Sequence, residues 1–259
     1  MENTKRILSY ARRAIDDYEM IRPGDKIAVG ISAGKDSLSL LVAMAQLRRF
    51  YPVPFELCAI TIDMGFAGGM DFTPIRRLCE ELDVPYHIIP TEIYKIIFEV
   101  RKESNPCALC AKMRRGALNN AAKALGCTTV ALGHHFDDVV DTFMLNLFFE
   151  GRIGCFQPVT HLSRQDIRVI RPLIYMPERH IRYFSSHVEL PVIPSPCPAD
   201  KHTEREEMKQ LLTSLEKKYP GLRYRLYGAL QRGEVDGFHL PKSGRMPGEK
   251  EYTQGSDQE

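Results

Sequence analysis

The chain lacks the large net charge, the long apolar runs and the apolar N-terminal segment that would assign it to a simple class of protein. Its 35 Lys and Arg residues against 33 Asp and Glu leave a net charge of only +2, so it is no polybasic protein that binds nucleic acid through overall charge, although a local basic face is compatible with this balance. No apolar run approaches the roughly 20 residues that span a bilayer, and the N-terminal residues are charged where a signal peptide would be apolar. We therefore expect a cytoplasmic protein without a membrane partner.

The cysteines of the chain do not indicate a disulfide framework. The chain has seven cysteines, an odd number, and in a reducing cytosol thiols act as core residues, metal ligands or reactive groups. Intrinsic disorder is excluded as well, because 44% of the 259 residues are hydrophobic and 26% are charged. We expect one large domain, or one domain with a small appendage.

Short apolar runs alternate with helical periodicity along the chain. Residues 3–21 have the 3.6-residue period of an amphipathic helix, which Pro23 and Gly24 end. Helical stretches also follow the segments that we predict as strands, which are residues 26–32, 55–63, 86–91, 128–134 and 167–173. This alternation predicts an α/β fold with a doubly wound parallel sheet and a ligand at the carboxyl ends of its strands.

The composition changes beyond residue 190. A proline-rich, irregular stretch precedes two charged amphipathic helices, and the last residues are Gly, Ser and charged residues with almost nothing to bury. We therefore predict a main domain over residues 1–190, a small helical appendage over residues 191–240 and a flexible tail over residues 241–259.

A loop of small residues, SAGKDS at residues 32–37, follows the first predicted strand. Free backbone N–H groups and the N-terminus of the next helix favour phosphate binding there, and Lys35 adds a full positive charge. The loop is not a Walker P-loop, because Asp36 stands where Ser or Thr would coordinate Mg²⁺, and the chain has no G-x-G-x-x-G. The other interpretation is an ordinary strand-to-helix turn with Ser and Asp as helix caps.

A second cluster, GHHFDD at residues 133–138, closes the fourth predicted strand and opens the next helix. Two His and two Asp at the carboxyl end of a strand could bind a ligand or a metal ion. Alternatively, Asp137 and Asp138 favour the helix dipole, and the histidines cap the helix or fill gaps. Asp63, at the end of the second strand, is either a further residue of a nucleotide pocket or a turn residue before Gly65.

Three cysteines are candidates for a zinc, redox or iron-sulfur site. Cys107 and Cys110 form a Cys-x-x-Cys pair that opens a basic helix, and zinc, redox and iron-sulfur sites all use this spacing. Cys197 lies in a proline-rich loop and offers a third thiolate. Cys58 lies in a predicted strand and Cys127 at the end of a predicted helix, so both are expected to be core or edge residues. Cys155 lies in a loop and is a further candidate ligand.

The order of these motifs resembles a known family. The loop at 32–37 and the GHHFDD segment with Thr142 are similar to the SGGxDS and GHHxDDxxxT motifs of PP-loop ATP pyrophosphatases, with Ala33 in place of the first glycine. Together with Cys-x-x-Cys, R-R-G, R-P-L and a late I-P-x-x-C, from about residue 24 to 225, they resemble the tRNA 2-thiocytidine synthetase family. If the position of Ala33 requires positive φ, its Cβ strains the loop.

The resemblance implies a PP-loop α/β fold and an ATP-dependent tRNA sulfurtransferase. ATP would be cleaved between its α- and β-phosphates, and the C2 carbonyl of a cytidine, at position 32 of the anticodon loop, would be adenylated and its oxygen replaced by sulfur. The implied catalytic residues are Lys35, Asp137 and Arg114, with Asp137 also a candidate ligand of Mg²⁺. The implied ATP-binding residues are Ser32, Ala33, Gly34, Lys35, Asp36, Ser37, Asp63, Gly133 and His134, the last two through their backbones.

The resemblance also implies cofactors and partners. A [4Fe-4S] cluster would be held by Cys107, Cys110 and Cys197, and its open iron would bind sulfide. ATP and Mg²⁺ complete the implied cofactors, tRNA is the substrate, and a sulfur donor such as a cysteine desulfurase is needed. Relatives commonly form homodimers, and Cys155 is an open candidate for a sulfur relay.

Basic residues cluster near these motifs and in the appendage. Any one of them is more often solvated surface than a ligand contact. Together they could supply a basic rim for tRNA, with Tyr175 and Phe156 as stacking platforms for unpaired bases. The candidate tRNA-binding residues are Arg115, Arg168, Arg171, Lys201 and Arg205.

Two other functions stay open from the sequence. One is a different PP-loop tRNA-modifying enzyme, a thiouridine synthetase or nucleoside ligase, with zinc on the cysteines. A closed zinc site needs four ligands, and the chain lacks a second Cys-x-x-Cys to supply them. The other is a non-enzymatic metal- or redox-sensing module, which would have no reason to retain a phosphate loop.

Overall fold

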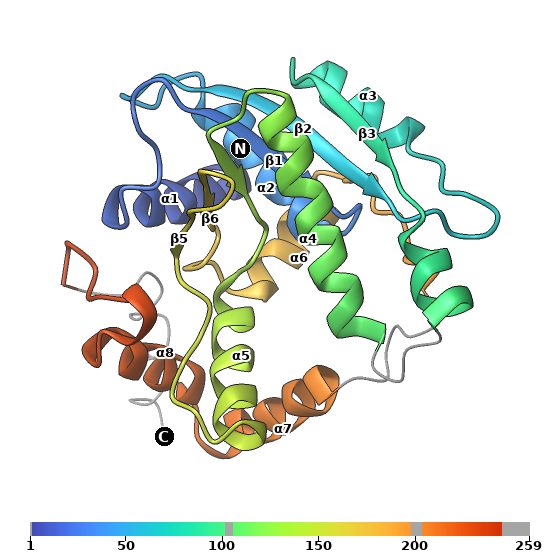
Figure 1. Cartoon of the computed structure of the whole chain (residues 1–259). Helices are drawn as coiled ribbons and strands as arrows, with labels where there is room; N and C mark the ends of the chain where they lie inside the picture. Colours follow the sequence, from blue (N-terminus) through green and yellow to red (C-terminus); the bar gives the residue numbers. More distant parts are fainter. Residues whose placement is uncertain (1, 102–105, 198–203, 245–259) are drawn as a thin grey trace.

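The computed structural model describes residues 2–101, 106–197 and 204–244 (Figure 1). In this part of the chain one sheet has six strands, in the order β3-β2-β1-β4-β6-β5. Their bounds are Lys26–Ile31 (β1), Glu56–Asp63 (β2), Tyr86–Pro90 (β3), Thr129–Ala131 (β4), Val159–Leu162 (β5) and Ile167–Ile170 (β6). All neighbouring pairs are parallel except β5 and β6.

The predicted α/β fold with a doubly wound sheet is confirmed, with one addition. Strand β5, at the edge, pairs antiparallel with β6 through a tight turn and was not predicted. It is only four residues long and half-buried, so it carries too few positions for a periodic pattern. The five predicted segments are the other strands, β4 and β6 being shorter than expected.

Helices cover both faces of the sheet because successive side chains of a strand point to opposite sides. Ile27 and Val29 of β1 face the helices α1, α2 and α6, whereas Ala28 faces α4. Figure 1 shows α4 on the other side of the sheet from α2. The bounds are Glu2–Asp17 (α1), Lys35–Leu47 (α2), Thr73–Glu81 (α3), Lys95–Arg101 (η1, a π-helix), Pro106–Ala124 (α4), Phe136–Phe149 (α5) and Glu178–His187 (α6).

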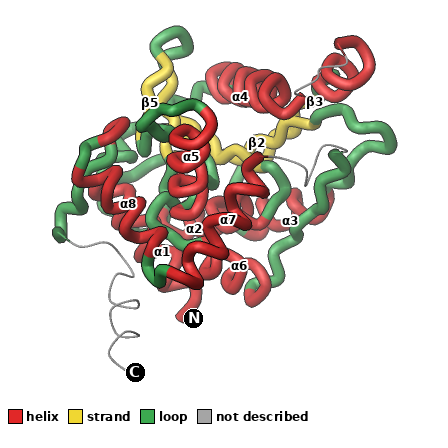
Figure 2. Tube along the Cα trace, turned by 90° about the horizontal axis from the view of Figure 1, so that it is seen from below, coloured by secondary structure: helices red, strands yellow, loops and turns green. Residues whose placement is uncertain are grey.

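The two predicted C-terminal helices are Glu204–Lys218 (α7) and Leu222–Arg232 (α8), followed by a short 3₁₀ turn, Val235–Gly237 (η2). They share the core of the main domain, since Leu212 of α7 and Tyr227 of α8 are fully buried in the cluster that includes α5. Figure 2 shows α7 lying between α5 and α6, with α8 beside α5. Helices α7 and α8 are thus packed onto the sheet domain.

The first residues of the predicted tail are held by α1. The backbone N–H of Lys242 donates to Asp17 Oδ1 at 3.1 Å, and its ammonium donates to the carbonyl of Asp16 at 2.8 Å. Residues 245–259 lie outside the described residues. Among the helices that the structure describes, none is long and apolar enough to cross a bilayer.

The strand order of the sheet predicts where a ligand binds. The chain order reverses between β1 and β4, which lie side by side with Val29 opposite Ala131. Loops at the carboxyl ends of two such strands diverge to opposite sides and leave a crevice. These two loops, residues 32–34 and 132–135, overlap the first and second predicted motifs at residues 32–37 and 133–138.

Candidate functional site

The loop at residues 32–37 turns around one hydroxyl. Ser37 Oγ accepts from the backbone N–H of Ser32 at 3.1 Å and donates to the carbonyl of Gly34 at 3.0 Å. Ala33 has φ +65°, the left-handed conformation that a Cβ disfavours. The loop leads into α2 at Lys35, so the N-terminus of α2 and its N–H groups face the crevice.

The second loop is packed against the first. A Cβ at Gly133 would come within 2.9 Å of the backbone carbon of Asp36 and 3.0 Å of the nitrogen of Ser37, both of which are backbone atoms that cannot rotate away. The glycine is therefore required for the two loops to touch. The predicted pair of motifs forms one site because this contact brings them together.

Both loops line a cavity of about 440 Å³. Polar groups on its wall come from the first loop and from the GHHFDD segment, and apolar ones come from β2 and the loop after it. The cavity also contains all three cysteines of the predicted cluster and the predicted Arg114. The polar and ionisable lining residues are Ser32, Asp36, Ser37, Thr61, Cys107, Cys110, Arg114, His134, Asp138, Ser195 and Cys197.

The cysteines reach the cavity from two directions. Cys107 and Cys110 lie on the first turns of α4, and Cys197 lies in the loop after α6. That loop is tied to the phosphate loop, since the backbone N–H of Ile193 donates to the carbonyl of Ala33 at 3.0 Å. Burial raises the pKa of the Cys110 thiol, the other two thiols add to this, and the guanidinium of Arg114 opposes it.

No three His, Cys, Asp or Glu side chains of the described ranges gather tightly enough for a single metal ion. An iron-sulfur cube requires a wider spacing of its ligands, because each thiolate binds a different iron atom. Cys107, Cys110 and Cys197 line the same cavity, so they are the thiols that could hold such a cube.

An acidic and a histidine side chain cap α5 at the cavity. His135 and Asp138 form a reciprocal capping box, with the N–H of His135 donating to Asp138 Oδ2 at 3.0 Å. Burial acts to raise the pKa of Asp138, but the two histidines, the N–H of His135 and Arg205 outweigh it and lower that pKa. His135 Nε2 also lies 3.7 Å from Asp36 Oδ1. The site thus holds two carboxylates, Asp36 and Asp138, on its wall.

The comparisons with known proteins agree with this geometry. A family model described as a PP-loop domain matches residues 5–216. The chain is 40% identical over 229 residues to the tRNA-cytidine(32) 2-sulfurtransferase of Pelobacter propionicus, covering 87% of this chain and 85% of that protein. With the enzyme of the same name from Geobacter sulfurreducens it is 41% identical over 229 residues, covering 87% and 89%. The chain belongs to the tRNA-cytidine(32) 2-sulfurtransferase family.

A solved structure resembles most of the fold. The U34-tRNA thiolase NcsA from Methanococcus maripaludis, determined with its [4Fe-4S] cluster, superposes with a TM-score of 0.71 at 26% sequence identity. The match covers 86% of this chain and 77% of that chain. The family and the α/β fold predicted from the sequence are therefore confirmed.

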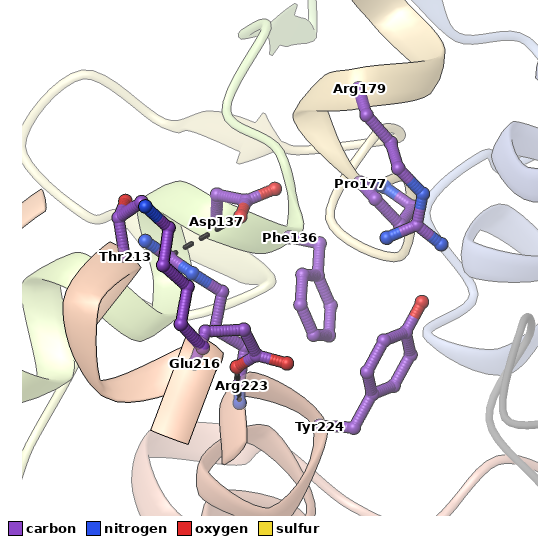
Figure 3. A pocket seen from close by; sticks show the side chains of 9 residues that line it. Phe136, Asp137, Pro177, Arg179, Thr213, Glu216, Arg223 and Tyr224 are labelled. Atoms are coloured by element: carbon purple, nitrogen blue, oxygen red, sulfur yellow. Dashed lines mark hydrogen bonds and ion pairs between the residues drawn. The ribbon is translucent and has the colours of Figure 1, made fainter. Parts of the chain in front are cut away.

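Asp137, predicted as catalytic or as a Mg²⁺ ligand, lies elsewhere in this member of the sulfurtransferase family. It lines a neighbouring pocket (Figure 3) and not the cavity of the two loops. Its Oδ2 accepts from the N–H of Glu178 at 2.7 Å and its Oδ1 lies 3.3 Å from Arg223 Nη1. Both oxygens are engaged by the packing of α6 and α8 on α5, and Asp138 is the carboxylate that lines the cavity. A catalytic or Mg²⁺-binding role of Asp137 stays a prediction.

Lys35 is held beside the cavity by two acids. Its ammonium lies 3.0 Å from Glu178 Oε1 and 3.0 Å from Asp36 Oδ2. Burial acts to lower the pKa of Lys35, but these two carboxylates outweigh it and raise that pKa. Lys35 is thus a permanent positive charge at the phosphate loop. The side chain does not itself line the cavity.

Asp63 is also outside the cavity lining, contrary to the prediction of an ATP-binding side chain. Its Oδ1 accepts from the N–H of Gly65 at 3.0 Å, so it closes the turn after β2, which is the alternative that the sequence left open. The cavity wall formed by β2 and the next loop is instead mostly apolar, with Ile60, Ile62 and Phe72 among its residues.

Two of the predicted tRNA-binding arginines are buried. Arg168, 7% exposed, forms an ion pair with Asp25, and Arg171, 8% exposed, donates to Thr160 Oγ1 at 3.3 Å and lies 4.9 Å from the centre of the Phe156 ring. They hold β6 to its neighbours and cannot contact a tRNA surface. Strand periodicity does not separate a buried arginine with a distant partner from an exposed one.

The remaining predictions divide between surface and interior. Arg115 and Arg205 are exposed as expected, and Lys201 lies outside the described residues. Tyr175 is fully buried and donates to Asp17 Oδ2 at 3.1 Å, so it is no stacking platform. Cys155 is buried as well, and burial raises the pKa of its thiol to about 12, which makes the unreactive protonated form dominant.

The sequence missed one residue beside the phosphate loop, Glu178, which pairs with Lys35. Its carboxylate lies 3.0 Å from Lys35 Nζ and from Arg182 Nη2, and 2.9 Å from Lys209 Nζ. Burial acts to raise the pKa of Glu178, but Lys209 and Lys35 outweigh it and hold that pKa well below its ordinary value. The available signal was its place at the start of α6, just after the R-P-L segment.

Proposed function

We propose that this chain is an ATP-dependent tRNA sulfurtransferase that converts a cytidine, at position 32 of the anticodon loop, to 2-thiocytidine. One observation carries the proposal: a single cavity contains the phosphate loop, the GHHFDD segment and Cys107, Cys110 and Cys197. An ATP-binding module alone would not need the cysteines, and a metal-sensing module would not need the loop.

The chain's own residues would bind ATP at the first loop. The N–H groups of residues 32–37 and the N-terminus of α2 would hold the phosphates, with Ser37 and the Lys35 charge beside them. Asp36 and Asp138 are the carboxylates that would hold Mg²⁺, since carboxylate oxygens suit this ion. The apolar wall from β2 would take the adenine.

Two bond exchanges then complete the reaction. The C2 oxygen of cytidine attacks the α-phosphorus, and pyrophosphate leaves as the bond to the β-phosphate breaks. Sulfur next replaces the adenylated oxygen at C2, and AMP leaves. Arg114 lines the same cavity as the cysteines, where its guanidinium would stabilise charge that develops on the base or the α-phosphate.

The three cysteines fit an iron-sulfur cluster. When bound by Cys107, Cys110 and Cys197, a [4Fe-4S] cluster would supply iron without a protein ligand, where sulfur can be held for transfer. The relative NcsA, which carries such a cluster, supports this assignment. A cysteine desulfurase as sulfur donor and a homodimeric state stay predictions.

The proposal is tested by thiolation in vitro. We expect anaerobically purified protein to form 2-thiocytidine in unmodified tRNA when ATP and sulfide are present, with one AMP and one pyrophosphate for each thiolated base. ATP with a methylene group between the α- and β-phosphates should support no product. Thiolated uridine without 2-thiocytidine would point to another PP-loop enzyme, and the absence of any ATP binding would point to a sensing module.

A further inference from the structure

Helix α4, in front of the sheet in Figure 1, concentrates positive charge. Its residues Pro106–Ala124 include Lys112, Arg114, Arg115 and Lys123, and they include no Asp or Glu. The whole chain has a net charge of only +2, so the residues outside α4 are net negative. The near-neutral chain therefore gathers its positive charge on the helix that carries the Cys-x-x-Cys pair.

Two sides of α4 have different surroundings. Cys107, Cys110 and Arg114 follow each other at intervals of three and four residues, which places them on one side of the helix, and all three line the main cavity. Lys112 and Arg115 lie three residues apart on a neighbouring side, where both are exposed and neither lines the cavity. Because Cys107 and Arg114 are exposed as well, the cavity opens to solvent along this part of α4.

The three cations at the opening have no acid beside them. Within the part of the chain that the structure describes, Lys112, Arg114 and Arg115 form no ion pair, whereas Lys35 pairs with Glu178 at 3.0 Å. The other exposed side chains on the first turns of α4 include those of alanines, at positions 108 and 111, which leave room for a chain to approach the helix. An anionic group is the complement of this surface.

A buried arginine adds to the positive potential. Arg171 is 8% exposed, and its guanidinium donates to two uncharged acceptors, the carbonyl of Gln157 at 2.5 Å and Thr160 Oγ1 at 3.3 Å. Burial, assisted by the charge of Arg115 and opposed by Cys155, lowers the pKa of Arg171 to about 10. Arg171 thus stays charged at neutral pH and strengthens the field around Arg115 without reaching the surface.

Phosphates of an RNA strand match this surface better than an acidic protein does. A cytidine whose base enters the cavity is covalently linked to a phosphate on each side, so these phosphates come to the opening together with the base. Each phosphate carries one negative charge, and guanidinium and ammonium groups both bind phosphate. An acidic protein would be attracted by the same charge, but nothing ties it to the base in the cavity.

We propose that Lys112 and Arg115 bind the phosphates that flank the reacting cytidine, so that the RNA strand crosses α4 where its base enters the cavity. Three helical residues advance by about 4.5 Å along the axis, and a nucleic-acid strand advances by about 3.4 Å per nucleotide, so the two cations are spaced for consecutive phosphates. The inference rests on the proposed function and assigns a substrate contact outside the catalytic cavity.

The test compares the loss of one positive charge at three positions. Lys112→Gln and Arg115→Gln change the outer side of α4. Arg49→Gln is the matched control, since Arg49 is exposed just beyond the C-terminal end of α2, about 20 Å along that helix from the phosphate loop. Binding of an anticodon stem-loop RNA is measured at several salt concentrations, and ATP binding is measured in parallel as a check of the fold.

We expect Lys112→Gln and Arg115→Gln each to weaken RNA binding about fivefold at 0.1 M salt and to reduce the salt slope by about 0.7, the value for one phosphate contact on a single strand. Arg49→Gln should change RNA binding less than about twofold, because charges more than about 10 Å apart are largely screened. ATP affinity should be unchanged in all three variants. Equal effects of Arg115→Gln and Arg49→Gln would overturn the inference, while thiolation by the wild type would stand.

A second RNA locates the contact. It has uncharged methylphosphonate linkages on both sides of the cytidine, so the wild type should bind it more weakly, and Arg115→Gln should cause little further loss on it. Equal losses by Arg115→Gln on both RNAs would overturn the placement beside the cytidine. Unchanged RNA binding with thiolation lost only when a protein supplies the sulfur would overturn it in favour of an acidic protein. A wild type that forms no thiolated base would overturn the proposed function as well.

Discussion

Ala33 has a left-handed backbone, and this strain is a property of one residue. A Cβ at φ +65° costs about 1–2 kcal/mol relative to glycine, and the greater freedom of glycine in the unfolded chain returns about 0.4–1 kcal/mol. We therefore expect Ala33→Gly to raise the free energy of unfolding by about 1 kcal/mol in urea titrations. Ala43→Gly, inside α2, should lower it by about the same amount. A loss of stability in Ala33→Gly would contradict the strain.

His134 makes stability depend on pH. Burial, with Arg171 nearby, lowers its pKa to about 3, against about 6.5 in the unfolded chain. A group with a depressed pKa of this kind binds more protons when unfolded, so stability falls as pH drops from about 6.5 toward 3. Between pH 7 and pH 5 this amounts to about 2 kcal/mol.

The variant that tests this is His134→Gln, studied by urea unfolding at both pH values. We expect its loss of stability between pH 7 and 5 to be smaller than that of the wild type by up to about 2 kcal/mol. His161→Gln, on the exposed strand β5, serves as the control and should keep the wild-type pH dependence. Identical pH profiles for His134→Gln and wild type would show that His134 is not held neutral.

At the residue scale, the sequence was enough to locate the motifs. It was not enough to predict which way their side chains point. The loop at 32–37 and the GHHFDD segment were found because they end predicted strands, and parallel strands bring such ends together. Which of Asp137 and Asp138 faces the cavity depends on how α6 and α8 pack around α5, which no local pattern records. Arg168 was missed as an interior residue because its partner Asp25 is 143 positions away.

At the scale of elements, Glu178 connects the C-terminal helices to the phosphate loop. Its carboxylate, at the start of α6, binds Lys35 of α2 and Lys209 of α7. Its backbone N–H binds Asp137 of α5, which pairs with Arg223 of α8. Five helices therefore meet at one acid with a side chain that is 11% exposed.

Removing the negative charge of Glu178 should weaken the packing of these five helices. We expect Glu178→Gln to lower the free energy of unfolding by about 3 kcal/mol at pH 7, because it leaves the partly buried Lys209 without its partner and Lys35 with Asp36 alone. The pKa of Glu178 is depressed, so its contribution is present above the unfolded pKa of about 4.5 and is lost as pH falls below it. The difference between variant and wild type should therefore shrink toward pH 3.5.

Lys209→Met is the matched control for this prediction. It removes one cation and leaves Lys35 and Arg182 on Glu178, so the loss should be less than about half that of Glu178→Gln. Urea titrations of both variants at pH 7 and pH 3.5 make the comparison. An effect of Glu178→Gln that is equal at both pH values would contradict an electrostatic role.

The elements themselves were largely predictable. Long apolar runs such as β2 and clear helical periods such as α5 carry enough positions to define their type. Strand β5 was missed because four residues define no period, and the packing of α7 and α8 into the core of the sheet domain could not be derived from their charged, amphipathic sequences.

At the scale of the molecule, the fold gathers three cysteines from two segments far apart in the sequence at the cavity that the phosphate loop lines. Cys107 and Cys110 arrive on α4, whereas Cys197 arrives on a loop that is hydrogen-bonded to the phosphate loop. The family resemblance predicted that these three cysteines act together. Their spacing alone is compatible with a zinc site, a redox site or an iron-sulfur site. The single cavity explains why an ATP loop and a thiol set occur together.

Iron and acid-labile sulfide in anaerobically purified protein test this account most directly. We expect about four irons and four sulfides per chain in the wild type and in Cys155→Ala, whose thiol is buried away from the cavity. Cys107→Ala and Cys197→Ala should both lose the cluster while ATP binding persists. About one zinc per chain with no sulfide, or a cluster that survives in Cys197→Ala, would contradict the account.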